Sequence, residues 1–194
     1  MSDTRNGSGT RDTERTRRAI LDAAAQMIHQ HGTATAIGAV AEAAGVSKGG
    51  LLHHFRSRDE LFVAVAEHSL NTLRERVFAA VDLSENRPGK LLRAYIRVLF
   101  DGEDDIRSHF EYPGMWNTLC VVPGVAELLR ADAHFWRTAF AEDGLHPDRI
   151  LLVQHAADGL VSNMLWDTGL TGETIRHARE LLLNITERNT AFDS

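Results

Sequence analysis

Apolar residues recur at intervals of three and four along most of the chain, which is the spacing of one face of an α-helix. The first such helix is expected over residues 15–31, with Gly32 as its stop. Its apolar face carries Ile20, Ala24, Met27 and Ile28. No stretch alternates between apolar and polar residues as a half-buried strand does, and no internal repeat is present. The pattern predicts an all-α protein of about nine helices.

Two short helices joined by a tight turn are expected between residues 36 and 54. Gly45 stands where a helix ends in a left-handed residue. Ser47 can cap the second helix by accepting a hydrogen bond from its first free amides. Leu51 and Phe55, four residues apart, give that second helix one apolar face. This spacing is typical of a helix-turn-helix.

The outward face of the second helix carries Lys48, Gly49, Gly50, His53 and His54. Each glycine costs about 1 kcal/mol against alanine in a helix interior, so a compensating role is expected. A bare, cationic helix lets the backbone approach a groove of DNA, with the basic side chains beside the contact. The alternative is an irregular helix in an ordinary bundle.

The stretch AEAAGVSKGGLLHHFRSRDELF resembles the recognition unit of the TetR-like bacterial transcriptional repressors. The resemblance runs from about Arg17 to Leu70, and the later stretch ILLVQHAADGL is similar to the corynebacterial branch of multidrug-efflux repressors. The family usually places an aromatic residue where this chain has Leu52. The resemblance and the local charges together identify a candidate DNA-binding set: Arg17, Arg18, Ser47, Lys48, Gly49, Gly50, His53, His54 and Arg58. The two arginines near the start of the first helix are equally consistent with a solvated helix end.

Composition divides the chain into three parts. Residues 1–14 have no apolar periodicity and are expected to form a disordered tail. Residues 15–60 form the DNA-binding domain, and residues 61–194 form a helical ligand-binding and dimerisation domain. A long helix, which Ser57 can cap, leads from one into the other. It continues through Leu61, Val65, Leu73, Val77 and Val81.

The last two expected helices, over residues 147–166 and 172–188, carry more apolar surface than one bundle of this size covers. Pairing of two such hairpins about a twofold axis buries that surface, and the resemblance implies the same homodimer. A monomer with a thick core is the alternative. The predicted interface comprises Ala156, Ala157, Gly159, Ile175, Ala178, Leu182 and Ile185.

Aromatic residues concentrate in the middle of the chain, where they indicate either core packing or a pocket. The resemblance favours a small-molecule cavity lined by Tyr95, Leu99, Phe110, Met115, Trp116, Leu119, Phe135, Trp136, Gln154, His155 and Asp158. Asp158 interrupts an apolar helix and needs a partner. It either pairs internally with His155 or neutralises a cationic aromatic ligand held among the rings.

Charge and cysteine content narrow the function. The net charge of −6 divides into +1 over residues 1–60 and −7 over the rest, which fits a DNA-binding end on an acidic body. The single cysteine, Cys120, excludes an intrachain disulfide and is expected to be a small buried hydrophobe rather than a redox sensor. No apolar run of about 20 residues predicts a membrane span, so a cytoplasmic location is expected.

An enzyme is the rival class, but the chain carries no nucleophile elbow, phosphate-binding loop or paired metal-binding helix motif. No metal or cofactor is expected. The sequence predicts a ligand-responsive transcriptional regulator, a repressor that binds a near-palindromic operator as a homodimer and leaves it on binding a small hydrophobic or cationic aromatic molecule. The alternatives are a helical adaptor or an all-α enzyme without DNA binding.

Overall fold

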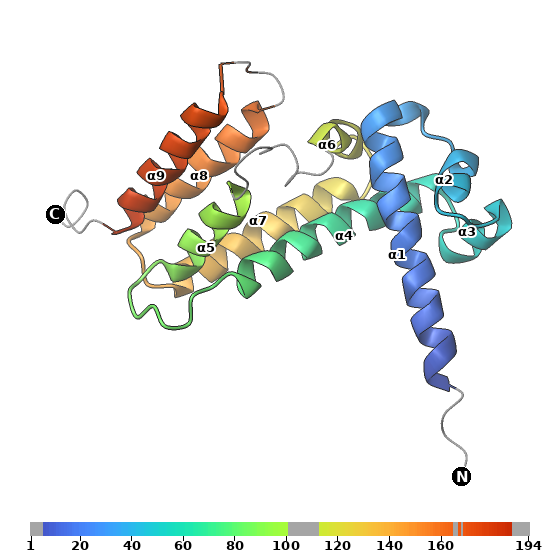
Figure 1. Cartoon of the computed structure of the whole chain (residues 1–194), viewed down its shortest axis with the longest axis horizontal. Helices are drawn as coiled ribbons and strands as arrows, with labels where there is room; N and C mark the ends of the chain where they lie inside the picture. The colour runs from blue at the N-terminus through green and yellow to red at the C-terminus, as the bar shows by residue number, and fades with distance from the viewer. Residues whose placement is uncertain (1–5, 101–112, 165–166, 168, 188–194) are drawn as a thin grey trace, which may run out of the picture. The chain divides into compact units, whose positions relative to one another are not determined.

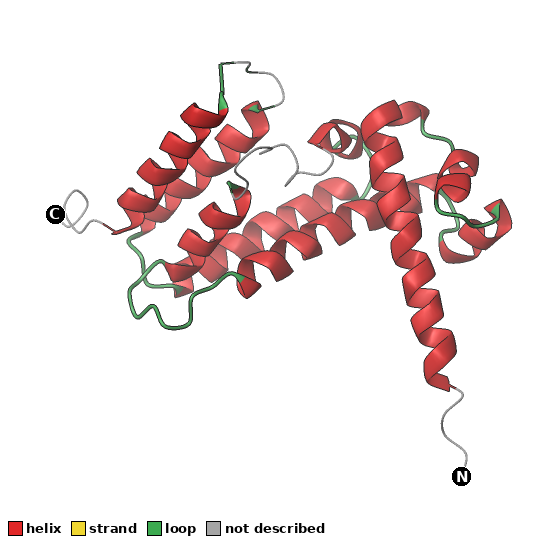
Figure 2. Cartoon of the chain, in the orientation of Figure 1, coloured by secondary structure: helices red, strands yellow, loops and turns green. Residues whose placement is uncertain are grey.

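The computed structural model describes residues 6–100, 113–164, 167 and 169–187. Over these residues the protein is helical, with no strand (Figure 2). The α-helices are α1 (Asn6–His31), α2 (Ile37–Ala43), α3 (Lys48–His54), α4 (Arg58–Ala79), α5 (Lys90–Leu99), α6 (Pro113–Leu119), α7 (Val125–Glu142), α8 (Pro147–Asn163) and α9 (Gly172–Glu187), with a short 3-10 turn, η1 (Gly32–Ala34), after α1 (Figure 1). The all-α prediction is confirmed. Phe110, predicted to line the cavity, lies outside the described residues.

Helix α1 begins nine residues earlier than expected, so residues 6–14 are helical where a disordered tail was predicted. Local contacts support this extra length. The guanidinium of Arg15 pairs with Asp12 at 3.1 Å, and the hydroxyl of Thr16 donates to the Asp12 carbonyl at 2.8 Å. Such contacts one turn apart stabilise a helix even where no tertiary packing is present.

The chain divides into two compact units, which are described separately. Unit 1 comprises Met1–Ser69 and Tyr112–Leu128, and is thus larger than the predicted domain over residues 15–60. The addition is α6, which packs on α1. A Cβ on Gly114 of α6 would lie 2.8 Å from the ring of His29 in α1, so only glycine allows this approach.

Three residues predicted to line the cavity lie on α6. Met115 and Leu119 of α6 are 3% and 0% exposed and belong to the core of unit 1. Trp116, on the same helix, is half-buried. The sequence could not show this, because the packing of α6 on α1 joins segments about 90 residues apart. These three residues belong to unit 1, whereas the other described residues of the predicted cavity belong to unit 2.

Unit 2 comprises Leu70–Glu111 and Leu129–Ser194, and its core is built around α5. Helix α5 is buried on nearly every side, by the end of α4 and by α7, α8 and α9. Helices α8 and α9 lie side by side (Figure 1). Three residues predicted at the dimer interface, Ala157, Ile175 and Leu182, are instead at most 5% exposed and pack in this core. They face α5 because one face of each hairpin helix must cover it.

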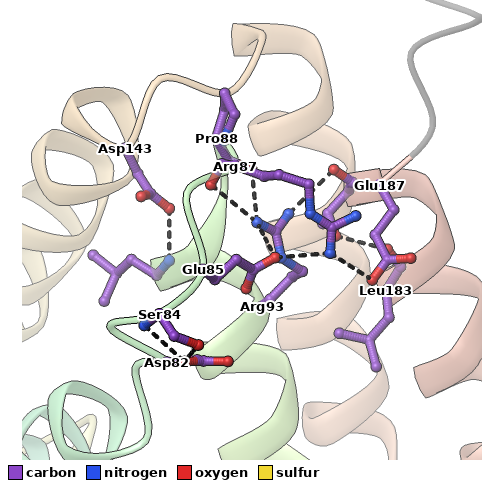
Figure 3. A network of polar contacts seen from close by, with 11 residues as sticks. Asp82, Ser84, Glu85, Arg87, Pro88, Arg93, Asp143, Leu183 and Glu187 are labelled. Carbon is purple, nitrogen blue, oxygen red and sulfur yellow. Dashed lines mark hydrogen bonds and ion pairs between the residues drawn. The ribbon is translucent and has the colours of Figure 1, made fainter.

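A buried arginine closes one end of unit 2 (Figure 3). Arg93 of α5 is fully buried, and its guanidinium lies 2.9 Å from the carboxylate of Glu85 in the α4–α5 loop. It also donates to the backbone carbonyls of Pro88 at 2.8 Å and of Thr186 in α9 at 3.3 Å. Because a buried charge is tolerated only when it is paired and hydrogen-bonded, this network ties the loop and α9 to α5.

Two further observations concern single expectations. Cys120 is exposed, not buried, because it lies in the turn just after α6. Among the described residues, no helix has both the length and the apolar content that crossing a bilayer requires.

Candidate DNA-binding face and effector site

The α2–α3 pair has the geometry of a helix-turn-helix. Gly45 turns the chain with a φ of +68°, and the amide of Val46 donates back to the carbonyl of Ala41 at 2.9 Å. The hydroxyl of Ser47 accepts from the amide of Gly50 at 3.0 Å, as predicted for a helix cap. The predicted helices over 36–44 and 47–54 are confirmed to within one residue at each end.

Burial divides α3 into two faces. Leu51 and the following Phe55 are at most 1% exposed and hold the helix to unit 1. Lys48, Gly49 and His53 are exposed on the opposite side, whereas His54 is half-buried. The predicted outward face is therefore present, with His54 partly withdrawn from it. Leu52 is 38% exposed, so this face also presents one apolar side chain to solvent.

At two helical glycines of this motif, neither packing within the protein nor backbone conformation requires glycine. A Cβ on Gly38 of α2 would meet no atom within 4 Å, and one on Gly49 would meet only the Ser47 hydroxyl, at 3.9 Å. Neither residue has a positive φ. By contrast, a Cβ on Gly50 would lie 3.2 Å from the Ser47 hydroxyl, which caps the helix. The fold thus leaves the surface at Gly38 and Gly49 bare and open.

The three predicted arginines have different surroundings. Arg18 is exposed, and half-buried Arg17 places its guanidinium 4.5 Å from the centre of the Phe55 ring. Arg58 is engaged within unit 1: its guanidinium donates to the carbonyls of Thr33 and Thr35, in the connection before α2. These hydrogen bonds position α2 against α4. Arg58 therefore has a positioning role within unit 1.

An aromatic cluster occupies unit 2. The ring centres of Tyr95 and Trp136 are 4.9 Å apart, and Trp136 stacks on Phe140 at 5.3 Å and 22°. Phe135 contacts the same indole edge-on at 5.2 Å. Phe78 of α4, half exposed, lies parallel to Trp136 at 6.2 Å. The structure thus brings the rings of Tyr95, Phe135 and Trp136 together, and Leu99 is 2% exposed in the same core.

Asp158 joins this cluster through an unpredicted partner. The phenol of Tyr95 donates a hydrogen bond to its carboxylate at 2.7 Å. The expected internal partner, His155, is exposed and acts only through its charge, and Gln154 is half-buried. Burial raises the pKa of Asp158, while the Tyr95 hydrogen bond and the charge of His155 oppose the rise. Burial and the nearby carboxylate raise the pKa of Tyr95 well above its ordinary value.

A second carboxylate, Asp132 of α7, was missed by the sequence reasoning. It is 9% exposed and accepts from the guanidinium of Arg74 in α4 at 2.7 Å. Burial raises the pKa of Asp132, and Arg74 and the indole of Trp136 oppose the rise by hydrogen bonding. Its position four residues before Trp136, on the same helix face, was the available signal. Within the described residues, no three His, Cys, Asp or Glu side chains gather as metal ligands.

Two family profiles match the chain. Residues 20–65 match the bacterial regulatory proteins of the tetR family. Residues 89–187, half of the chain, match the tetracyclin repressor-like C-terminal domain. The chain belongs to the TetR family. In this TetR-family protein the first match contains the helix-turn-helix. The second contains α8, α9 and the aromatic cluster apart from Phe78.

Curated relatives match only in part. The transcriptional repressor LfrR of Mycolicibacterium smegmatis is 38% identical over 92 residues, which cover 47% of this chain and 45% of LfrR. The regulator AcrR of Shigella flexneri is 35% identical over 65 residues, 33% of this chain and 30% of AcrR. The matched segment thus spans less than half the length of these relatives.

Solved structures share the fold over most of the chain. A transcriptional regulator from Rhodococcus sp. Rha1 superposes with a TM-score of 0.69 at 22% identity, covering 88% of this chain and 95% of that one. The multidrug binding protein EbrR, complexed with malachite green, gives 0.63 at 23% identity over 88% and 97%. These likenesses extend the TetR fold across both units.

Proposed function

We propose that this TetR-family protein is a transcriptional regulator that binds duplex DNA with the outward face of α3. The observation that carries the proposal is the bare, cationic surface formed by Lys48, Gly49 and His53, held in place by the buried Leu51. An α-helix with its side chains is about 10 to 12 Å in diameter, which fits a major groove about 12 Å wide. The function places the protein in the cytoplasm, where bacterial DNA lies.

The regulator acts as a homodimer through the outer faces of α8 and α9. Leu152, which is 51% exposed, shares one face of α8 with Ala156 and Gly159. A Cβ added to Gly159 would meet no atom within 4 Å. On α9, Leu181 and Ile185 are 49% and 38% exposed and stand one turn apart. This revised surface replaces the three predicted interface residues that lie in the core. A dimer of this kind favours a near-palindromic operator with recognition helices about 34 to 36 Å apart.

The effector is a small aromatic molecule with a positive charge. Asp158 supports this class, because a carboxylate among aromatic rings favours a cation that can also stack. The name of LfrR identifies it as a repressor, and EbrR has been crystallised with malachite green and with ethidium, which are cationic aromatic dyes. Effector binding in unit 2 releases the repressor from its operator.

A gel shift with DNA from upstream of the protein's own gene tests the DNA-binding proposal. Lys48→Ala is expected to weaken specific binding by about 1 to 3 kcal/mol if Lys48 contacts a base, or to lower the salt dependence by about one ion if it contacts a phosphate. Arg137→Ala is the matched control, because it removes an exposed positive charge from α7. Equal binding by all three proteins would remove α3 from the contact, and a helical adaptor would shift no DNA at all.

A further inference from the structure

The guanidinium of Arg74 sits in unit 2 as a planar cationic ligand would. It pairs with Asp132, through Nε at 2.7 Å and also through a terminal nitrogen. Its central carbon lies 4.3 Å from the centre of the Phe135 ring, so the cation is held by a carboxylate and an aromatic face together. These are the two features that select a flat cation over a compact ammonium ion.

The Arg74 side chain is partly exposed to solvent, whereas the carboxylate with which it pairs is mostly buried. The side chain of Asp132 is 12% exposed, whereas that of Arg74 is 27% exposed. Phe78, half exposed, lies edge-on to Phe135 at 6.1 Å and borders the same group of rings. Removal of the Arg74 side chain would therefore leave an opening from the surface to a buried carboxylate beside an aromatic ring.

A second carboxylate, Asp158, lies near the pair of Arg74 and Asp132. Burial raises the pKa of both Asp132 and Asp158. The two carboxylates are also close enough for the charge of Asp132 to raise the pKa of Asp158. Arg74 neutralises only one of the two carboxylates, since Asp158 is held by the neutral phenol of Tyr95. A second carboxylate beside the Arg74–Asp132 pair favours a cation at this position.

We propose that Asp132 and Phe135 form a subsite for a guanidinium or amidinium group on an aromatic effector, and that Arg74 is the built-in occupant which the effector displaces. The inference rests on the proposed effector response and names the cationic group that the effector carries. Arg74 belongs to α4, the helix that follows the helix-turn-helix in the chain. Its release from α7 is therefore the local event through which binding is sensed.

The test is chemical rescue of the full-length Arg74→Ala variant, followed by thermal unfolding and calorimetry without DNA. Removal of Arg74 leaves Asp132 unpaired, so the variant melts at a lower temperature than the wild type. Benzamidinium is expected to raise its melting temperature with saturation, and to bind at least about tenfold more tightly than to the wild type, where the tethered Arg74 competes. Benzylammonium, with the same ring and charge but no planar cation, should bind more weakly.

Asp132→Asn combined with Arg74→Ala should abolish the rescue, because the rescuing charge has lost its partner. Equal benzamidinium binding by the wild type and the Arg74→Ala variant, or rescue that survives Asp132→Asn, would overturn the proposal. If Arg74→Ala does not fold, Arg74→Met keeps the aliphatic packing and is read by the same titration. A negative result with a wild type that still shifts its operator would remove this subsite and leave DNA binding by α3 intact.

Discussion

In α3, Gly49 has opposite effects on the stability of the helix and on the proposed DNA contact. Glycine at position 49 weakens the helix, yet the space around it would accept a methyl group. We therefore expect Gly49→Ala to raise the free energy of unfolding by up to about 1 kcal/mol. The same methyl group would keep the backbone from the DNA, and operator affinity should fall by about 1 to 3 kcal/mol.

Denaturant unfolding and DNA titration of Gly49→Ala measure the two effects separately. Gly45→Ala is the contrasting variant, because its φ of +68° strains any other residue and should lower stability. If Gly49→Ala gains stability without any loss of affinity, the bare surface has no part in DNA contact.

The hydrogen bond between Tyr95 and Asp158 is a second residue-scale test. Tyr95→Phe removes the donor from a partly buried carboxylate and should lower the free energy of unfolding by about 1 to 3 kcal/mol at neutral pH. In the wild type, burial raises the folded-state pKa of Asp158 above its ordinary value of 3.8. Asp158 therefore contributes most to the free energy of unfolding below pH 3.8, and this contribution is lost as the pH rises from 3.8 through the folded-state pKa.

Loss of the Tyr95 hydroxyl raises the pKa of Asp158 further, because its hydrogen bond stabilises the ionised carboxylate more than the protonated one. The difference in stability between Tyr95→Phe and the wild type should therefore shrink as the pH falls through the folded-state pKa of Asp158. Urea titrations at several pH values measure it, and a pH-independent difference would mean that Asp158 is not the group involved.

At the scale of elements, the buried charge of Arg93 ties α5 to α9 and to the preceding loop. Arg93→Met keeps the volume but removes the buried partner of Glu85, which is left with exposed Arg87 alone, and it removes the donor to the carbonyls of Pro88 and Thr186. It should lower the free energy of unfolding by about 3 to 5 kcal/mol. Arg87→Met is the control, because Arg87 is 63% exposed in its pairs with Glu85 and Glu187 and should contribute about 0 to 1 kcal/mol. Similar losses for both variants, measured by denaturant unfolding, would contradict the role given to burial.

The elements themselves were largely predictable. The caps at Gly45 and Ser47 are local features, and they fixed the helix-turn-helix to within one residue. The partner of Asp158 was not predictable, because Tyr95 lies 63 residues away and only tertiary packing brings the two together. The same holds for Arg74 and Asp132, 58 residues apart. Periodicity finds the face of a helix, but not which neighbour covers it.

At the scale of the whole molecule, the proposed dimer depends on which side of α8 and α9 faces outward. Leu181→Glu changes a half-exposed residue, and should convert a dimer into a folded monomer as measured by light scattering and circular dichroism. Leu182→Glu changes a residue that is 5% exposed, and should unfold unit 2 instead, because it buries a charge without a partner. A dimer that persists in folded Leu181→Glu would place the interface elsewhere.

The central claim, that a dimer of this protein reads DNA with α3, is tested most directly by footprinting on the DNA upstream of its own gene. The account predicts two protected half-sites with related sequences, separated by about 10 to 10.5 base pairs or a multiple of that spacing. Protection should weaken at both half-sites with Lys48→Ala. Absence of protection by the folded wild type, or a footprint unchanged by Lys48→Ala and Gly49→Ala together, would contradict it.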